Sequence, residues 1–212
     1  MNDFKIRWIL FLKKIFANTD RVSTEHLDLL NKTMAQLHEL VRKSQSKDKI
    51  PLLKEILLPY GIPMGINNSE VLKRLRNHRI LSQYDLSVEM NHRYKVYFVK
   101  MWFNPLCLDV QFHLIDNQLY LSKTKFLTRL NSQQYECFLN GFIGLDYHLD
   151  RYSGILPYYL ADEQSNLLRI HNSKGYPSVT YYSGDKKVQT KIESIVKQQN
   201  LLNFLSTNFY SQ

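Results

Sequence analysis

The feature that most constrains this chain is a strict alternation of residue types between positions 106 and 114. Large apolar residues occupy every second position, in the order Leu106, Leu108, Val110, Phe112 and Leu114, and they are separated by Cys107, Asp109, Gln111 and His113. Successive side chains of a β-strand point to opposite faces, so a period of two predicts a strand with one face turned to the core. The chain is therefore expected to form a sheet.

Further strands are expected on both sides of this segment. Residues 94–102 are rich in β-branched and aromatic side chains, which favour strands. Asp116-Asn117 predicts a tight hairpin after the alternating strand. Three more strands are predicted at 155–161, 166–171 and 176–183, with turns at 162–165 and 173–175.

The strand after the hairpin carries a conflict that predicts an irregularity. Continuing the register of a two-residue hairpin places Lys123 opposite Val110, on the apolar face. Burying an ammonium group without a partner is costly. We therefore predict a β-bulge near Ser122-Lys123, which turns Thr124 and Phe126 inward and both Lys123 and Lys125 outward.

Helical patterns precede and follow the strands. Ser23 predicts the N-cap of a long helix whose apolar positions are spaced alternately by three and four residues: Leu27, Leu30, Met34, Leu37 and Val41. Pro51 suits the first turn of a short helix that ends before Pro59. A last helix is predicted over residues 187–205.

Two more short helices are predicted from their capping signals. Asn67 is followed three residues later by Glu70, and Asn131 is followed in the same way by Gln134. This spacing resembles a capping box, with Asn in place of Ser or Thr. Each of these helices stands directly before one group of predicted strands.

The order of these elements predicts an α+β fold. N-terminal helices are followed by a helix and three strands, a second helix and three strands, and a C-terminal helix. Runs of hairpin-linked strands with helices between them are typical of antiparallel α+β folds. We therefore expect a helical N-terminal region at residues 1–59 and a tandem helix–three-strand antiparallel sheet module at residues 60–212.

Charge and cysteine content constrain the partners and the compartment. The chain has 212 residues and a formal net charge of +9, and residues 1–130 hold 21 of its 28 Lys and Arg against 12 of its 19 Asp and Glu. This excess favours anionic partners. Cys107 and Cys137 have no disulfide-framework or zinc spacing, which favours a reducing compartment. The N-terminal apolar run is too short for a signal peptide or a spanning helix, so the expected location is cytoplasmic.

No motif identifies a catalytic residue, a metal site or a cofactor site. Asp146, His148 and Asp150 alternate, so on a strand they share one side and suit a divalent metal or acid–base chemistry, whereas in a loop they are solvated. Cys137 and His148 have the composition of a nucleophile and its base, but the apolar helical neighbours of Cys137 favour burial. We predict the loop and the burial, and hence a protein that is not an enzyme and takes no cofactor, metal or small-molecule substrate.

A partner-binding surface is predicted where basic and aromatic residues interleave. Arg93, Lys95 and Tyr97 share one face of the strand over 94–102, and the bulge would let Lys123 and Lys125 join them. Such a patch can follow phosphates while an aromatic ring stacks on a base. The alternative is an ordinary sheet whose lysines and arginines solvate an edge.

The N-terminal segment is a second candidate surface. Residues 4–16 place Trp8 and other apolar residues among lysines and an arginine. With so few polar residues, a helix here must bury most of its circumference. Three sites of burial stay open: the chain's own core, an apolar groove on a partner protein and a membrane surface.

One short motif resembles a known family. It reads Gly65-Ile66-Asn67-Asn68-Ser69-Glu70-Val71, with Leu75 after it. This stretch is similar to the Gly-hydrophobic-Ser-x-x-Glu-Val…Leu helix opening of small tandem α/β modules, which include the β-lactamase inhibitor proteins and the small outer-membrane assembly lipoproteins. The resemblance covers Tyr60 to Gly184 and implies a module without catalytic residues that grips a partner protein with its sheet face and loops. The chain departs from the family in lacking an export signal and a lipid-anchor cysteine near its start, and in its helical residues ahead of the motif.

These observations together predict a non-enzymatic protein-interaction module, of inhibitor or immunity type, that neutralises a partner protein. A basic accessory protein that binds nucleic acid or a nucleoprotein assembly is the first alternative. A membrane-surface adaptor that acts through residues 4–16 is the second.

Overall fold

The chain divides into two compact units, Met1–Gln36 and Leu37–Gln212. A computed structural model describes residues 24–44, 50–51, 58, 62–87, 92–103, 106–135, 137 and 158–209. Helix α2 (Thr24–Ser44) runs across the division between the units. Its length confirms the long helix that the spacing of three and four predicts, while Ser23 lies outside the described residues.

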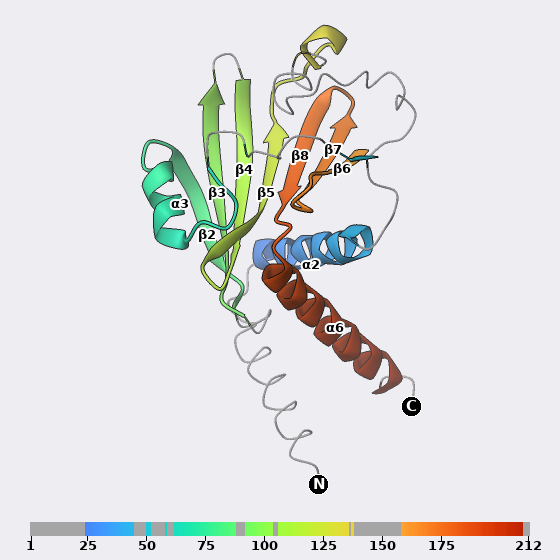
Figure 1. The fold of residues 1–212 in the computed structure, drawn as a ribbon. Coiled ribbons are helices and arrows are strands. Elements are labelled where there is room, and N and C mark those ends of the chain that lie inside the picture. Colours follow the sequence, from blue (N-terminus) through green and yellow to red (C-terminus); the bar gives the residue numbers. More distant parts are fainter. Residues whose placement is uncertain are drawn as a thin grey trace. The chain divides into compact units, whose positions relative to one another are not determined.

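The second unit is built on one sheet (Figure 1). Its elements after α2 are, in chain order, β1 (Ile50–Pro51), α3 (Asn68–Leu75), β2 (Arg79–Asp85), β3 (Tyr94–Phe103), β4 (Leu106–Ile115), β5 (Gln118–Phe126), β6 (Tyr158–Ala161), β7 (Leu167–Ser173), β8 (Tyr176–Tyr182) and α6 (Lys186–Phe209). The bounds of β3, β4, β8 and α6 agree with the predicted ones to within a few residues.

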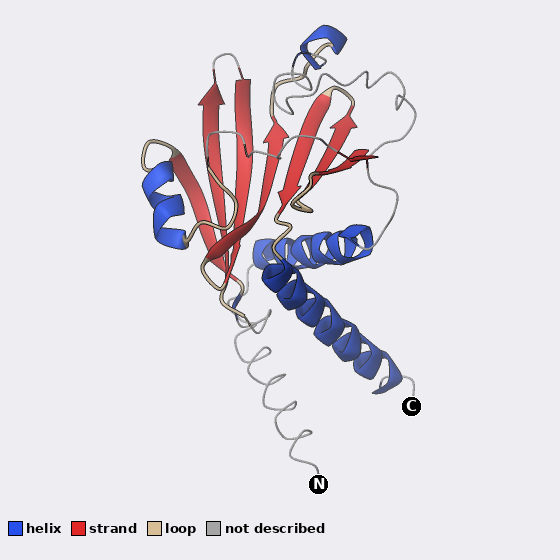
Figure 2. Cartoon of the chain, in the orientation of Figure 1, coloured by secondary structure: helices blue, strands red, loops and turns tan. Residues whose placement is uncertain are grey.

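The sheet joins two antiparallel meanders, which confirms the predicted α+β class. The strand order is β1-β6-β7-β8-β5-β4-β3-β2, in which β2 to β8 pair antiparallel and the two-residue β1 is parallel to β6. Strands β2 to β5 form the first meander and β6 to β8 form the second (Figure 2). Because β5 pairs with β8, the two meanders make one continuous surface.

The first meander has one more strand than the sequence predicts. The additional strand, β2, is the edge of the sheet beside β3, and most of its side chains are exposed. Its pairing is interrupted at Leu81, since Ile80 lies opposite Val99 and Ser82 lies opposite Phe98. An edge strand buries little of either face, so the alternation that marks β4 is missing from β2.

Pro51 differs from its predicted place. It lies in β1 opposite Ala161 rather than in the first turn of a helix. Proline has no backbone N–H to donate, and an edge strand tolerates this because its outer side has no ladder to complete. The rest of the helix predicted before Pro59, residues 52–57, lies outside the described residues.

The predicted β-bulge exists, but it lies earlier in β5. Leu119 is opposite Leu114 and Leu121 is opposite His113, so Tyr120 is the additional residue rather than Ser122 or Lys123. The side chain of Tyr120 is fully buried. From this point on the register is regular, and Lys123 lies opposite Gln111 instead of Val110. The bulge therefore solves the conflict over the lysine as predicted, at a different residue.

One face of the sheet carries the main core. Leu108, Val110, Phe112 and Leu114 of the alternating strand β4 are 1% exposed there, and Leu106 is partly buried. Apolar residues of β3, β5, β7 and β8 join them. The buried members on these strands are Tyr97, Val99, Met101, Leu108, Val110, Phe112, Leu114, Leu119, Phe126, Leu168, Ile170, Val179 and Tyr181. Val71 and Leu75 of α3 pack into the same cluster, so we call this the α3 face.

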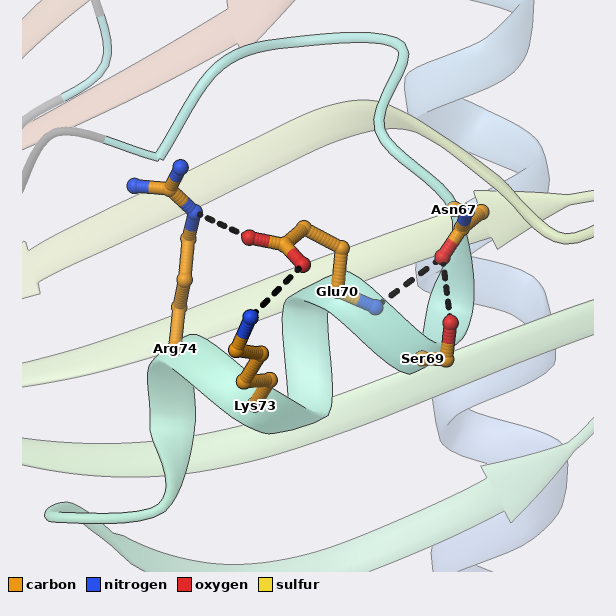
Figure 3. A network of polar contacts seen from close by, with 5 residues as sticks. All are labelled: Asn67, Ser69, Glu70, Lys73 and Arg74. Atoms are coloured by element: carbon orange, nitrogen blue, oxygen red, sulfur yellow. Dashed lines mark hydrogen bonds and ion pairs between the residues drawn. The ribbon is translucent and has the colours of Figure 1, made fainter.

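Helix α3 begins as its capping signal predicts. The Glu70 N–H donates to Asn67 Oδ1 at 2.9 Å, and the Ser69 hydroxyl donates to the same oxygen at 2.7 Å (Figure 3). The Glu70 carboxylate turns along the helix, where its Oε1 lies 3.1 Å from Arg74 Nε and its Oε2 lies 3.9 Å from Lys73 Nζ. Asn67 thus satisfies the helix N-terminus alone, and Glu70 stabilises the next turn.

Candidate functional site

The face of the sheet opposite the α3 face changes character along its strands. Side chains on it form four rows, of which the first three join residues that lie opposite one another in the ladders. The inner row is Val96, His113, Leu121 and Tyr182, and the middle row is Phe98, Gln111, Lys123, Thr180 and Arg169. Next comes a charged row of Lys100, Asp109, Lys125, Ser178 and His171, and finally an apolar row of Trp102, Cys107, Leu127 and Tyr176.

The inner row is buried, and its His113 belongs to a polar network with two tyrosines that lie outside the row. The Tyr94 hydroxyl lies 3.1 Å from His113 Nδ1 and is hydrogen-bonded to the Tyr120 hydroxyl. All three side chains are fully buried. Burial lowers the pKa of His113 to about 3, and the nearby positive charge of Lys123 contributes to the same shift. Burial also raises the pKa of Tyr94 far above its usual value. The network is therefore uncharged at neutral pH, which suits a structural role rather than proton transfer.

A second polar cluster ties the C-terminal part of α2 to the second meander. Glu39 Oε1 accepts a hydrogen bond from the Tyr159 hydroxyl and lies 3.3 Å from Arg169 Nε. The Lys43 ammonium stands 4.5 Å from the centre of the Tyr159 ring. Burial and the adjacent Glu39 raise the pKa of Tyr159 to about 12. All four groups are used in contacts within the second unit.

Helix α6 is tied to the hairpin between β4 and β5. The Lys191 ammonium lies 2.7 Å from Asp116 Oδ2 and holds the pKa of that carboxyl below its usual value. Asp116 and Asn117 have positive φ angles of 47° and 68°, as in the predicted two-residue turn. Buried Val188, Ile192, Ile195 and Val196 mark the inward side of α6.

The apolar row lies at the far end of the same face. Trp102 is 70% exposed, Tyr176 42% and Leu127 37%. Trp102 is opposite Cys107, whose carbonyl accepts the Leu127 N–H at 2.9 Å. Tyr176 stands two residues before Ser178, which is opposite Lys125. Neighbouring strands thus bring three large exposed side chains onto one line.

The charged row lies directly beside the apolar row. Lys100 and Lys125 flank Asp109 from both sides, because each is opposite it in its ladder. Lys125 is exposed, whereas Lys100 and Asp109 are half-buried. Ser178 and His171 continue this row onto β8 and β7. We call the charged row and the apolar row together the open face.

The open face combines exposed aromatic and charged side chains. Its tryptophan and tyrosine are of the types enriched at the centres of protein interfaces, and the charged row beside them is of the kind found at interface rims. Within the described residues, no three His, Cys, Asp or Glu side chains gather in a way that could hold a metal ion. Two free cysteines are described: Cys107 is half-buried, and Cys137 is exposed rather than buried as predicted.

The structure does not bring the predicted binding residues together. Lys95 and Tyr97 point to the α3 face, since Tyr97 is opposite Phe112, whereas Lys123 and Lys125 point to the opposite face. Tyr97 is 1% exposed and donates a hydrogen bond to Asn68 Oδ1 at 2.7 Å, so it is part of the core. Arg93 is exposed just before β3. Only the two lysines of β5 lie on the face opposite the α3 face. Lys125 is in the charged row and Lys123 is in the middle row.

Several other sequence candidates lie outside the described residues. These are Trp8 with the segment 4–16, and the alternating Asp146, His148 and Asp150. For the described helices, none is long and apolar enough to cross a membrane. The membrane and partner hypotheses for residues 4–16 stay predictions.

Compared with known proteins, the chain matches no family model, no curated protein and no solved structure. The resemblance at Gly65 to Leu75 stays a prediction.

Proposed function

We propose that this chain is a non-enzymatic interaction module that binds a partner protein through the open face. The observation that carries the proposal is the exposed Trp102, at 70%, in one line with Leu127 and Tyr176 and beside the row of Lys100, Asp109 and Lys125. Large aromatic side chains exposed in one group on a soluble protein are typical of interaction sites. They supply most of the binding energy when a partner covers them.

The charges beside Trp102 favour a partner with an acidic patch that also contains hydrogen-bond donors. Two lysines of the charged row attract carboxylates, and Asp109 between them accepts from a donor on the partner. The net charge of +9 increases the association rate with an acidic protein. An inhibitor or immunity-type role, in which binding neutralises the partner, agrees with this surface and with the resemblance at Gly65 to Leu75. The proposed compartment is the cytoplasm, in agreement with two free cysteines.

Nucleic acid is the second candidate, favoured by the same tryptophan beside the two lysines of the charged row. An exposed aromatic ring beside basic side chains on a sheet can stack on a base while the lysines contact phosphates. Asp109 counts against it, because a carboxylate in the middle of the lysine row repels a phosphate backbone. Protein binding is therefore our first choice.

Replacing the tryptophan tests the proposal. The partner is first isolated with the full chain as bait from the cells that naturally make it, and is then purified. We expect Trp102→Ala to weaken its binding by about 2 kcal/mol, roughly thirtyfold, because an aromatic anchor at the centre of an interface contributes about this much. Titration calorimetry measures the affinity. Leu72→Ala is the matched control, since Leu72 is an exposed apolar residue (36%) on α3, and it should leave the affinity unchanged.

The charged row provides the independent arm of the test. Lys100→Gln combined with Lys125→Gln should reduce the association rate and flatten its dependence on salt. A single-stranded oligonucleotide serves as the competing probe: tight binding to it that falls steeply with salt and with the double substitution would favour the nucleic-acid function. Full affinity for the protein partner in both open-face variants would refute the proposal.

A further inference from the structure

A polar pocket lies at the end of the second meander, and its lining includes neither Trp102 nor the lysines of the open face. It has a volume of about 710 Å³, which lies in the usual range for small-ligand sites. One wall is the segment that comes after β5 in the chain, with Arg129, Asn131, Ser132 and Gln134. The other wall is the β7–β8 hairpin, with Asn172 and Gly175. The Leu130 N–H donates to the Gly175 carbonyl at 2.8 Å and joins the two walls.

Backbone hydrogen bonds fix the orientation of the three amide side chains in this pocket. Asn131 Oδ1 accepts from the Gln134 N–H at 2.8 Å, and Gln134 Oε1 accepts from the Asn131 N–H at 3.0 Å. Asn172 Oδ1 accepts from the Gly175 N–H at 3.1 Å. An N–H can only donate, so each oxygen is committed to the backbone and each NH₂ group is left with its two donors. These amides can therefore donate hydrogen bonds to a ligand, but they offer it few acceptors.

Arg129 adds a positive charge, and its side chain lies against the hairpin. At Gly175, whose φ is +86°, an added Cβ would stand 2.9 Å from Arg129 Cγ and 3.1 Å from Arg129 Nε. The missing side chain thus leaves room for the arginine to lie against the turn. Among the residues that the structure describes, none forms an ion pair with Arg129.

We propose that this pocket binds a carboxylate. A carboxylate has only acceptors, and a guanidinium receives its two oxygens in a parallel pair of hydrogen bonds. The NH₂ groups of Asn131, Gln134 and Asn172 complete a wall of donors around the arginine. The carboxylate belongs either to a free dicarboxylic acid or to the C-terminus of a peptide, since both carry this group.

Titrating the full chain with defined probes tests the proposal and separates the two sources. The probes are succinate, N-acetyl-alanyl-alanine with a free carboxylate, the same peptide as its amide, and inorganic phosphate. NMR shifts of the amide signals of residues 129–135 and 172–175 report the binding. We expect succinate or the free-acid peptide to bind, the tighter of the two to identify the source, and the peptide amide to bind at least tenfold more weakly.

Three pocket variants and one control decide whether the donors are responsible. Arg129→Gln removes the charge, while Gln134→Glu and Asn172→Asp keep the oxygen that the backbone N–H needs and replace the donors by a negative charge. Each should raise the dissociation constant at least tenfold. Arg76→Gln, at the exposed end of α3, should change it less than twofold.

Three results would overturn the proposal. They are equal binding of the peptide acid and its amide, binding of phosphate but of no carboxylate, and unchanged carboxylate affinity in Gln134→Glu and Asn172→Asp. The open-face variants Trp102→Ala and Lys125→Gln should leave carboxylate binding unaltered. Carboxylate binding in the pocket and partner binding at the open face can therefore fail independently of each other.

Discussion

Lowering the pH from 7 to 5 should reduce the free energy of unfolding by about 2 kcal/mol through His113 alone. The pKa of this buried side chain is about 3 in the folded chain, against about 6.5 for an unfolded histidine. As the pH falls, the unfolded state therefore binds a proton at His113 before the folded state does. The contribution of His113 to the free energy of unfolding is complete above pH 6.5 and is lost as the pH falls towards 3. Over that whole range the loss amounts to about 4 kcal/mol.

Urea unfolding at pH 7, 6 and 5 measures this effect. The comparison is His113→Gln, whose amide stays neutral at every pH and can still accept from the Tyr94 hydroxyl. The wild-type curve should descend more steeply than the variant curve over this range, which lies above the titration of ordinary carboxyl groups. Parallel curves would show that His113 is protonated in the folded chain as easily as in the unfolded one.

Gly184→Ala should be the most damaging glycine-to-alanine substitution among the glycines that the structure describes. A Cβ at position 184 would stand 2.1 Å from the Gln164 carbonyl oxygen, 2.6 Å from the Ser165 carbonyl carbon and 2.7 Å from the Asn166 nitrogen. These are backbone atoms of the turn between β6 and β7, which also binds Gly184 through Asn166 Oδ1 at 2.6 Å. We expect a loss of about 3 kcal/mol and a melting temperature lower by about 10 °C.

Gly65→Ala is the matched control for this loss. Gly65 has a φ of +78°, but no atom lies within 4 Å of its added Cβ. The change there should cost only the left-handed backbone strain, about 1 kcal/mol. Thermal unfolding followed by circular dichroism compares the two variants. Equal losses at both positions would mean that the turn yields easily and that its contact with Gly184 contributes little.

The fold was predictable where a segment buries one face and exposes the other. Strand β4 has this asymmetry, and the two capping pairs, Asn67 with Glu70 and Asn131 with Gln134, act within four residues. Such local causes can be read from one stretch of sequence. Strand β2 and the two-residue β1 exist through pairing with neighbours, and so they left no local pattern.

The side of the sheet taken by each residue of β3 was harder to predict. Val96 and Tyr97 are adjacent and both buried, because one packs in the inner row and the other in the α3 face. With apolar residues on both sides, the strand offers no alternation from which to orient it. The prediction therefore placed Lys95 and Lys123 on one face, although they lie on opposite ones.

The open face could not be predicted from local patterns. Trp102, Leu127 and Tyr176 come from separate stretches, and the third joins the others only because β5 pairs with β8. Trp102 could have been noticed as a tryptophan near the end of its strand, two residues after Lys100. Its neighbours in the row depend on long-range pairing, which periodicity does not encode.

The β5–β8 ladder also has a consequence for how the molecule assembles. Within each meander short connections join consecutive strands, so their pairing closes small loops at little entropic cost. β6 and β7 lie between β5 and β8 in the chain, so the pairing of β5 with β8 closes a much longer loop. Before it closes, both strands present unsatisfied edges. A domain swap between two copies of the chain would have to open this seam, because each C-terminal meander could then pair with β5 of the other copy.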